Sequence, residues 1–107
     1  MRITTVVTAL LTISIASSSW ASSILVQSTT STANSGLYDH ILPKFTEMTG
    51  IEVNVVAVGT GQAIRNAQNC DGDVLLVHAK ASEEAFVSEG YGVARSDVMY
   101  NDFVIVG

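Results

Sequence analysis

Four short apolar runs recur along this 107-residue chain, and stretches with helical periodicity separate them. Strands that alternate with helices predict an α/β protein with a mostly parallel sheet and flanking helices. The third run is apolar at every position, which predicts a central strand that helices cover on both faces. The four runs, in chain order, are Ile24–Val26, Ile51–Val58, Val74–Val77 and Phe103–Val106.

The longest helix is predicted over Leu37–Thr49, where apolar residues recur at helical spacing. We expect Asn34 or Ser35 to cap its start and Gly50 to end it. Pro43 predicts a kink, because proline has no backbone N–H to donate within a helix. The apolar stripe of this helix consists of Leu37, Ile41, Phe45 and Met48.

Two shorter helices are predicted over Ala63–Gln68 and Glu83–Glu89. Ser82 is expected to cap the second of them, whose acidic first turn suits the helix dipole. Gly90 is expected to end it.

The N-terminal residues differ from the rest of the chain. Arg2 gives a positive start, Ile3–Ala16 is an uncharged apolar stretch, and Ser19 and Ala21 are small residues at positions that a signal peptidase reads. The uncharged stretch is shorter than the roughly 18 residues of a membrane-spanning helix. We therefore predict a signal peptide over residues 1–21 and an exported, periplasmic chain that begins at Ser22.

The charge balance excludes several classes of partner. The chain has 5 basic and 10 acidic residues, and its formal charge of −5 becomes more negative once Arg2 is removed with the leader. Such an acidic chain is not suited to nucleic acid or to an anionic membrane surface. Cys70 is the single cysteine and has no internal disulfide partner, and two histidines without further thiols form no recognisable zinc pattern.

Two segments rich in small and hydroxyl residues follow the first two apolar runs, Ser28–Ser35 and Gly59–Gln62. Consecutive Ser and Thr favour caps and turns, so we expect these segments to be a loop and a turn. Each precedes a predicted helix, where free backbone N–H groups and the helix dipole attract anions. Ligands bind beyond the carboxyl ends of parallel strands, so the two segments together predict an anion-binding site. Ser28–Ser35 alone would be read as an ordinary polar connection.

Four motifs follow one another in the chain: STTST at 28–32, VGTGQA at 58–63, DVLLVHA at 73–79 and DVMYNDFVIVG at 97–107. Together they resemble those of the tungstate-binding periplasmic proteins of ABC transporters. The resemblance implies a type II periplasmic binding protein fold, in which two α/β lobes close on a tetrahedral oxyanion. The chain ends at Gly107, directly after the fourth apolar run, so we expect residues 22–107 to be a truncated first lobe with the second lobe absent.

The resemblance also implies the site residues and the partners. Carried over by motif, Thr30 and Ser31 would contact the oxyanion with hydroxyls, and Thr60, Gly61 and Gln62 would form the second anion-facing segment. A cationic contact would come from the other lobe. The implied partner is an ABC transporter permease. For the protein itself, the resemblance implies no enzymatic activity, no cofactor, no metal-cation site and a monomeric full-length state.

Two positions depart from the family pattern. Ser28 stands where the family usually has Thr, which keeps a hydroxyl donor, and Lys80 stands where a proline is usual after the His-Ala pair. His78 itself is interpreted as a structural residue at a strand end, because no acid or nucleophile is tied to it by local sequence.

The chemistry of the ligand is consistent with this resemblance. Tungstate, molybdate and sulfate are fully deprotonated at neutral pH, so their site needs hydrogen-bond donors only. A site for protonated phosphate benefits from a carboxylate acceptor, and neither Ser28–Ser35 nor Gly59–Gln62 contains an acid. Loop donors alone do not separate tungstate from molybdate.

Three other functions fit the sequence less well. Gly59-Thr60-Gly61 lacks both the Lys-Ser/Thr ending of a P-loop and the third glycine of a dinucleotide fingerprint, which disfavours nucleotide binding. An exported hydrolase could pair Ser31 with His78, but the chain has no Gly-x-Ser-x-Gly elbow. The ligand-sensing lobe of a regulator could share the fold, although it would not need an export signal.

Overall fold

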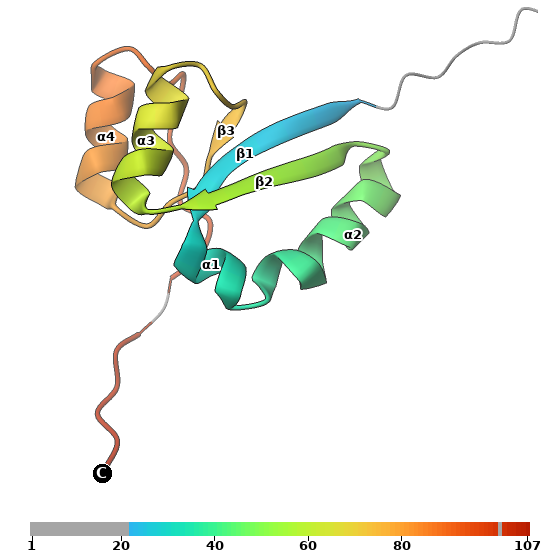
Figure 1. Cartoon of the computed structure of the whole chain (residues 1–107). Helices are drawn as coiled ribbons and strands as arrows, with labels where there is room; N and C mark the ends of the chain where they lie inside the picture. The colour runs from blue at the N-terminus through green and yellow to red at the C-terminus, as the bar shows by residue number, and fades with distance from the viewer. Residues whose placement is uncertain (1–21, 101) are drawn as a thin grey trace, which may run out of the picture.

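A computed structural model describes residues 22–100 and 102–107, and in them it confirms an α/β architecture with a parallel sheet and flanking helices (Figure 1). The predicted signal peptide lies outside the described residues, as does Asn101. The strands are β1 at Ser23–Thr29, β2 at Glu52–Val58 and β3 at Val74–Leu75. Figure 1 shows α2 running back along the strands on one side, with α3 and α4 together on the other.

The strand order is β2-β1-β3, so the first strand in sequence is the central one. The prediction that Val74–Val77 is central is therefore wrong, because β3 lies at an edge of the sheet in the described part of the chain. Val74 is 42% exposed and Leu75, Leu76 and Val77 are half-buried, so the apolar run indicates neither full burial nor a central place in the strand order. β3 also stops early: Leu76 still donates its N–H to Gln27 O at 2.9 Å, but its carbonyl accepts from the Ser28 hydroxyl at 2.8 Å.

The long helix α2 spans Leu37–Thr49, as predicted, and Gly50 ends it in the left-handed region with φ 72°. Pro43 lies inside it. The predicted caps are wrong, because the residue that precedes the helix is Gly36, at φ 81°. Ser35 has a smaller role and accepts a hydrogen bond from the Leu37 N–H at 3.3 Å.

The buried face of α2 differs from the predicted stripe. Ile41, Phe45 and Met48 are exposed, whereas Tyr38 is buried and Leu42 is half-buried. The Tyr38 hydroxyl forms a hydrogen bond with the buried Ser28 hydroxyl of β1. The side of the helix that faces the core therefore makes a polar contact with the sheet as well as apolar ones.

The helices α3, at Thr60–Gln68, and α4, at Lys80–Ser88, both begin three residues before their predicted starts. Ser82 is not the cap of α4, because it lies within the helix and Ala79 precedes it without a side-chain cap. Gly90 follows α4 at φ 87°.

The hydroxyl-rich segment is not a loop as predicted. β1 continues to Thr29, and a short helix α1 occupies Thr30–Asn34. The hydroxyls find partners within this turn, since Thr29 Oγ1 lies 2.8 Å from Thr32 Oγ1 and Ser35 donates to Thr32 O at 2.6 Å. Local side-chain bonds that were expected to disfavour helix therefore accompany one.

The predicted fourth strand, Phe103–Val106, is not a strand. Figure 1 shows the red C-terminal segment leading away from the sheet, so it has no neighbouring strand to pair with. Its side chains are exposed, Phe103 at 99% and Ile105 at 102%.

The core lies around β1, where the apolar Val26, Tyr38 and Ala63 are buried beside the polar Gln27, Ser28 and Thr29. Gln27 is satisfied there, because it donates to Asp71 O and accepts from Asn66 Nδ2 at 3.1 Å. In the part of the chain that the structure describes, no helix combines the length and apolar character needed to cross a membrane.

Candidate anion-binding site

The register of the sheet brings the two candidate segments together. Thr29, the last residue of β1, pairs with Val58, the last residue of β2. The carboxyl ends of the strands form the carboxyl edge of the sheet. α1 and α3 both begin at this carboxyl edge, from neighbouring parallel strands (Figure 1). β3 pairs with β1 in the same direction, which brings the residues after it to this edge too.

The candidate residues occupy the first turns of these two helices. Thr30 and Ser31 open α1, and Thr60, Gly61 and Gln62 open α3, so none of the five lies in a loop as predicted. Neither helix has a side-chain cap at its start. The first N–H groups of a helix have no partner within it, so two sets of backbone donors lie along one edge.

The Ser31 hydroxyl lies at this edge and is exposed to solvent. Its Oγ is 3.2 Å from His78 Nε2 and 3.3 Å from Thr29 Oγ1. His78 comes from the segment after β3 and is also exposed. The structure therefore places His78 against a candidate binding residue, a contact that local sequence could not reveal because 47 positions separate the two.

The Gln62 side chain is engaged within its own helix. Its Nε2 donates to Asn66 Oδ1 at 2.7 Å, and its Oε1 accepts from Arg65 Nη2 at 2.9 Å. In this arrangement the donor that Gln62 offers to the sheet edge is its backbone N–H.

Arg65 is a cationic group that the sequence reasoning missed. Its Nη1 lies 3.5 Å from the point that a β-carbon on Gly61 would occupy, so the guanidinium is folded back over the first turn of α3. The available signal was the spacing of four residues between Gly61 and Arg65, which places them on one helix face. Arg65 brings a positive charge close to one of the two donor sets.

Ser28, the residue at which the chain departs from the family pattern, serves the core instead of the edge. It is fully buried, and its hydroxyl contacts Tyr38 and Leu76. Of the hydroxyl-rich motif, Ser28 and Thr29 are buried, whereas Thr30 and Ser31 are exposed.

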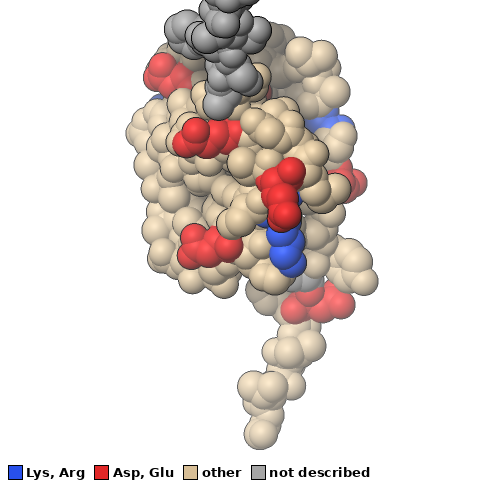
Figure 2. All heavy atoms as spheres, turned by 90° about the vertical axis from the view of Figure 1, so that its right-hand side faces the viewer, with Lys and Arg blue, Asp and Glu red and all other residues tan. Residues whose placement is uncertain are grey.

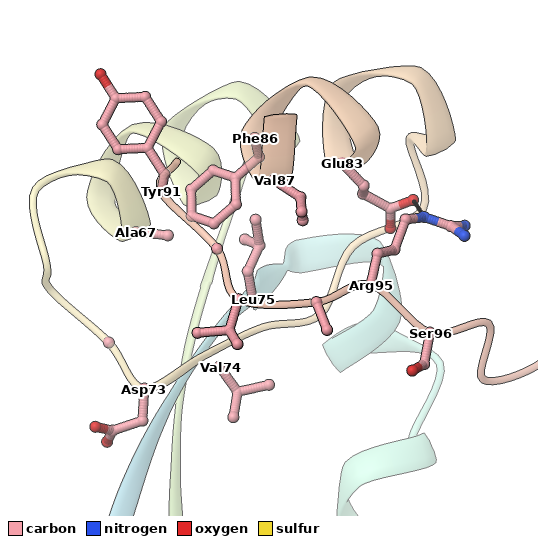
Figure 3. A pocket seen from close by; sticks show the side chains of 14 residues that line it. Ala67, Asp73, Val74, Leu75, Glu83, Phe86, Val87, Tyr91, Arg95 and Ser96 are labelled. Carbon is pink, nitrogen blue, oxygen red and sulfur yellow. Dashed lines mark hydrogen bonds and ion pairs between the residues drawn. The ribbon is translucent and has the colours of Figure 1, made fainter. Parts of the chain in front are cut away.

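A hollow of about 440 Å³ lies elsewhere, between β3, α4 and the segment that follows α4 (Figure 3). Phe86 and Tyr91 contribute aromatic rings to it, 5.7 Å apart between centroids. Its cation, Arg95, is already paired with Glu83 at 3.2 Å and with Asp97 at 2.7 Å. The hydrogen bond to Asp97 raises the pKa of the Arg95 guanidinium. None of the five candidate residues lines this hollow, which offers no free positive charge to an anion.

The surface charge matches the acidic composition. Figure 2 shows acidic side chains spread over the face in view, with few basic groups among them. Within the described residues, no three His, Cys, Asp or Glu side chains are grouped as metal ligands would be.

Comparison with protein families supports this reading of the fold. A family model described as a PBP superfamily domain matches residues 15–107. This chain belongs to the PBP superfamily. The names of the matching curated relatives describe binding proteins and not enzymes. One is the tungstate-binding protein TupA of Peptoclostridium acidaminophilum, 60% identical over 85 residues, which cover 79% of this chain and 30% of the relative.

Solved structures also match this chain. The tungstate-binding protein TupA from Desulfovibrio alaskensis G20 aligns with a TM-score of 0.75 and 54% identity, over 77% of this chain and 33% of that protein. The tungstate ABC transporter protein from Geobacter sulfurreducens aligns with a TM-score of 0.71 and 48% identity, over 75% and 34% of the two chains. The chain thus spans about a third of the length of the relatives it matches.

Proposed function

We propose that this chain captures a tetrahedral oxyanion, tungstate or else molybdate, as part of the substrate-binding component of an ABC importer. The observation that carries the proposal is the pairing of Thr29 with Val58, which aligns the first turns of α1 and α3. The names of relatives at 60% and 54% identity supply the ligand, because those proteins are described as tungstate-binding.

The proposed binding residues offer donors that suit a dianion. Thr30, Ser31 and Thr60 carry hydroxyls, and the first-turn N–H groups, including those of Gly61 and Gln62, add backbone donors. No acidic residue lies in either first turn, so neither turn offers a carboxylate that could accept a hydrogen bond from a protonated ligand. The exposed carboxyl edge of the sheet in one lobe cannot surround a tetrahedral ion. We therefore propose that a second lobe closes on the ion.

The remaining parts of the proposal concern context. Residues 22–107 form part of the first of two lobes, the whole protein is a periplasmic monomer, and it delivers the anion to a transporter permease. The oxyanion is cargo, and the protein needs neither a cofactor nor catalysis.

Calorimetric titration with tungstate, molybdate and phosphate tests the ligand. Because the chain spans about a third of its relatives, the experiment joins it to the remaining part of a tungstate-binding relative. Tungstate and molybdate are expected to bind far more tightly than phosphate. Ser31→Ala removes a hydrogen bond to a charged group and should cost about 1.5–3 kcal/mol, or roughly ten- to a hundredfold in affinity.

Ser88→Ala is the matched control for Ser31→Ala. Ser88 is also an exposed helical serine, but it lies at the end of α4 and donates to Ala85 O. Its replacement should leave tungstate affinity unchanged. Equal affinity for phosphate and tungstate, or wild-type affinity in Ser31→Ala, would show that the binding residues have been assigned wrongly.

The contact between Ser31 and His78 favours one second candidate, a hydrolase with a serine nucleophile. A nucleophile–base pair of this kind is usually completed by an acid that orients the histidine, and no carboxylate is bonded to His78 among the described residues. Turnover of aryl esters that disappears in Ser31→Ala would favour hydrolysis over binding. We expect no turnover.

Export predicts the start of the recovered protein. Cleavage after Ala21 should yield a periplasmic chain whose first residue is Ser22, and N-terminal sequencing of the periplasmic fraction measures it. Recovery of intact Met1 in the membrane fraction would contradict the prediction.

A further inference from the structure

We propose that His78 is the positioning residue for Ser31 and donates its Nε2–H to Ser31 Oγ, so that the Ser31 hydroxyl hydrogen is left for the anion. The inference rests on the proposed function, because the direction of this hydrogen bond is chosen to leave a hydrogen-bond donor for the proposed anion. The 3.2 Å distance between the two atoms fits a hydrogen bond in either direction.

The two directions have opposite consequences for an anion. A serine hydroxyl has one hydrogen and two lone pairs. If Ser31 donated to His78, its hydrogen would be used and only lone pairs would face an approaching anion. If His78 donates, one Ser31 lone pair is used and the hydrogen can turn outward.

The surroundings of Ser31 leave that hydrogen without a stronger competitor among the described residues. Its other neighbour, Thr29 Oγ1, is 3.3 Å away, whereas the same Thr29 oxygen lies 2.8 Å from Thr32 Oγ1. The shorter contact pairs Thr29 with Thr32, and Ser31 remains exposed. In a neutral imidazole, the donating direction requires one His78 tautomer, with the proton on Nε2 and a bare Nδ1.

His40 supplies an internal reference with the opposite tautomer. Its Nε2 lies 3.2 Å from Lys44 Nζ, and an ammonium group can only donate, so His40 Nε2 must accept. The chain contains two histidines, so one imidazole nitrogen spectrum holds the test residue and its reference. His40 should carry its proton on Nδ1.

The first experiment records long-range ¹⁵N–¹H spectra of the full chain at about pH 8, where an imidazole is ordinarily neutral. We expect a protonated Nε2 at His78 and a bare Nε2 at His40. Ser31→Ala should shift the His78 Nε2 resonance and leave the His40 resonances in place. A bare Nε2 at His78, or averaging between its two tautomers, would overturn the proposal.

The second experiment separates positioning from general structure. Sodium tungstate is added to the chain joined to the remaining part of a tungstate-binding relative, as in the calorimetric titration above, and to two variants of that joined protein. His78→Gln keeps an N–H donor at the end of the side chain, and His78→Phe keeps a ring without one. Affinity should stay within about twofold in His78→Gln and fall about two- to tenfold in His78→Phe, the loss expected for one neutral hydrogen bond. Equal affinity of the two variants would overturn the positioning role.

Failure of the proposed function would look different. If tungstate does not bind to the joined protein while His78 is protonated on Nε2, the ligand assignment fails and the direction of the hydrogen bond stands. If tungstate binds while His78 Nε2 is bare, the binding function stands and the positioning role fails.

Discussion

Ser28 and Ser31 belong to one hydroxyl-rich motif, yet their side chains serve opposite purposes. Ser28 is sealed in the core between Tyr38 and Leu76, whereas Ser31 is exposed at the carboxyl edge of the sheet. The difference arises because the strand ends at Thr29, and only the residues after it turn outward. Residue types alone could not assign these roles.

The buried serine should matter for stability. Ser28→Ala leaves the Leu76 carbonyl and the Tyr38 hydroxyl without this partner, and an unsatisfied buried group costs about 1–3 kcal/mol. Urea unfolding should show a lower midpoint by a corresponding amount. The exposed Ser88→Ala serves as control and should change little, so equal midpoints for the two variants would contradict this account.

At the scale of the element, α2 is bounded by two left-handed glycines, Gly36 and Gly50. A side chain at positive φ is strained whatever space is available. Gly50→Ala should therefore lower the free energy of unfolding by about 1 kcal/mol.

Gly59→Ala is the matched control for Gly50→Ala. Nothing lies within 4 Å of an added β-carbon at either position, but Gly59 has an ordinary φ of −64°. Its replacement should be neutral or slightly stabilising, because alanine restricts the unfolded chain. Thermal unfolding of the two variants compares conformational strain alone, and equal loss in both would mean that φ is not the cause.

The elements that sequence predicted well are those whose signals are local. The bounds of α2 follow from its helical periodicity and from Gly50, which needs no partner elsewhere in the chain. The helix caps are an exception, because those predicted at Asn34 or Ser35 and at Ser82 are wrong although their signals are local. The other main errors concern relations between elements. The edge position of β3 and the solvent exposure of Phe103–Val106 depend on which strands are neighbours, and α1 depends on hydroxyl contacts that arise only once the turn has formed.

The candidate site also divides into features with local sequence signals and features that depend on contacts between distant parts of the chain. The two donor segments could be predicted because strand ends and helix starts are visible in sequence. The nearness of His78 could not, because it follows from the pairing of β1 with β3. Arg65 was missed because its direction depends on its contact with Gln62.

At the scale of the whole molecule, the described C-terminal segment exposes a run of large apolar side chains. These include Tyr100 at 88%, Phe103 at 99% and Ile105 at 102% exposure. Contiguous exposed apolar surface and open strand edges favour association between copies. Multi-angle light scattering should find oligomers of the full chain whose share rises with protein concentration.

Placing two charges in this segment should reduce that association. Phe103→Lys with Ile105→Lys removes apolar surface and adds like charges. Ser82→Lys with Ser88→Lys adds the same charge to α4, where both serines are exposed, and should have little effect. Equal suppression by both pairs would attribute association to net charge and not to the apolar segment.

The order of the sheet also affects how the protein is made. β1 is the first strand to leave the ribosome, yet both of its neighbours, β2 and β3, are synthesised later. Until Glu52–Val58 has emerged, Val26 has no sheet to enter, and the Leu76 carbonyl that Ser28 bonds emerges later still. A ribosome that has made only the N-terminal half has therefore not yet supplied the partners that bury β1.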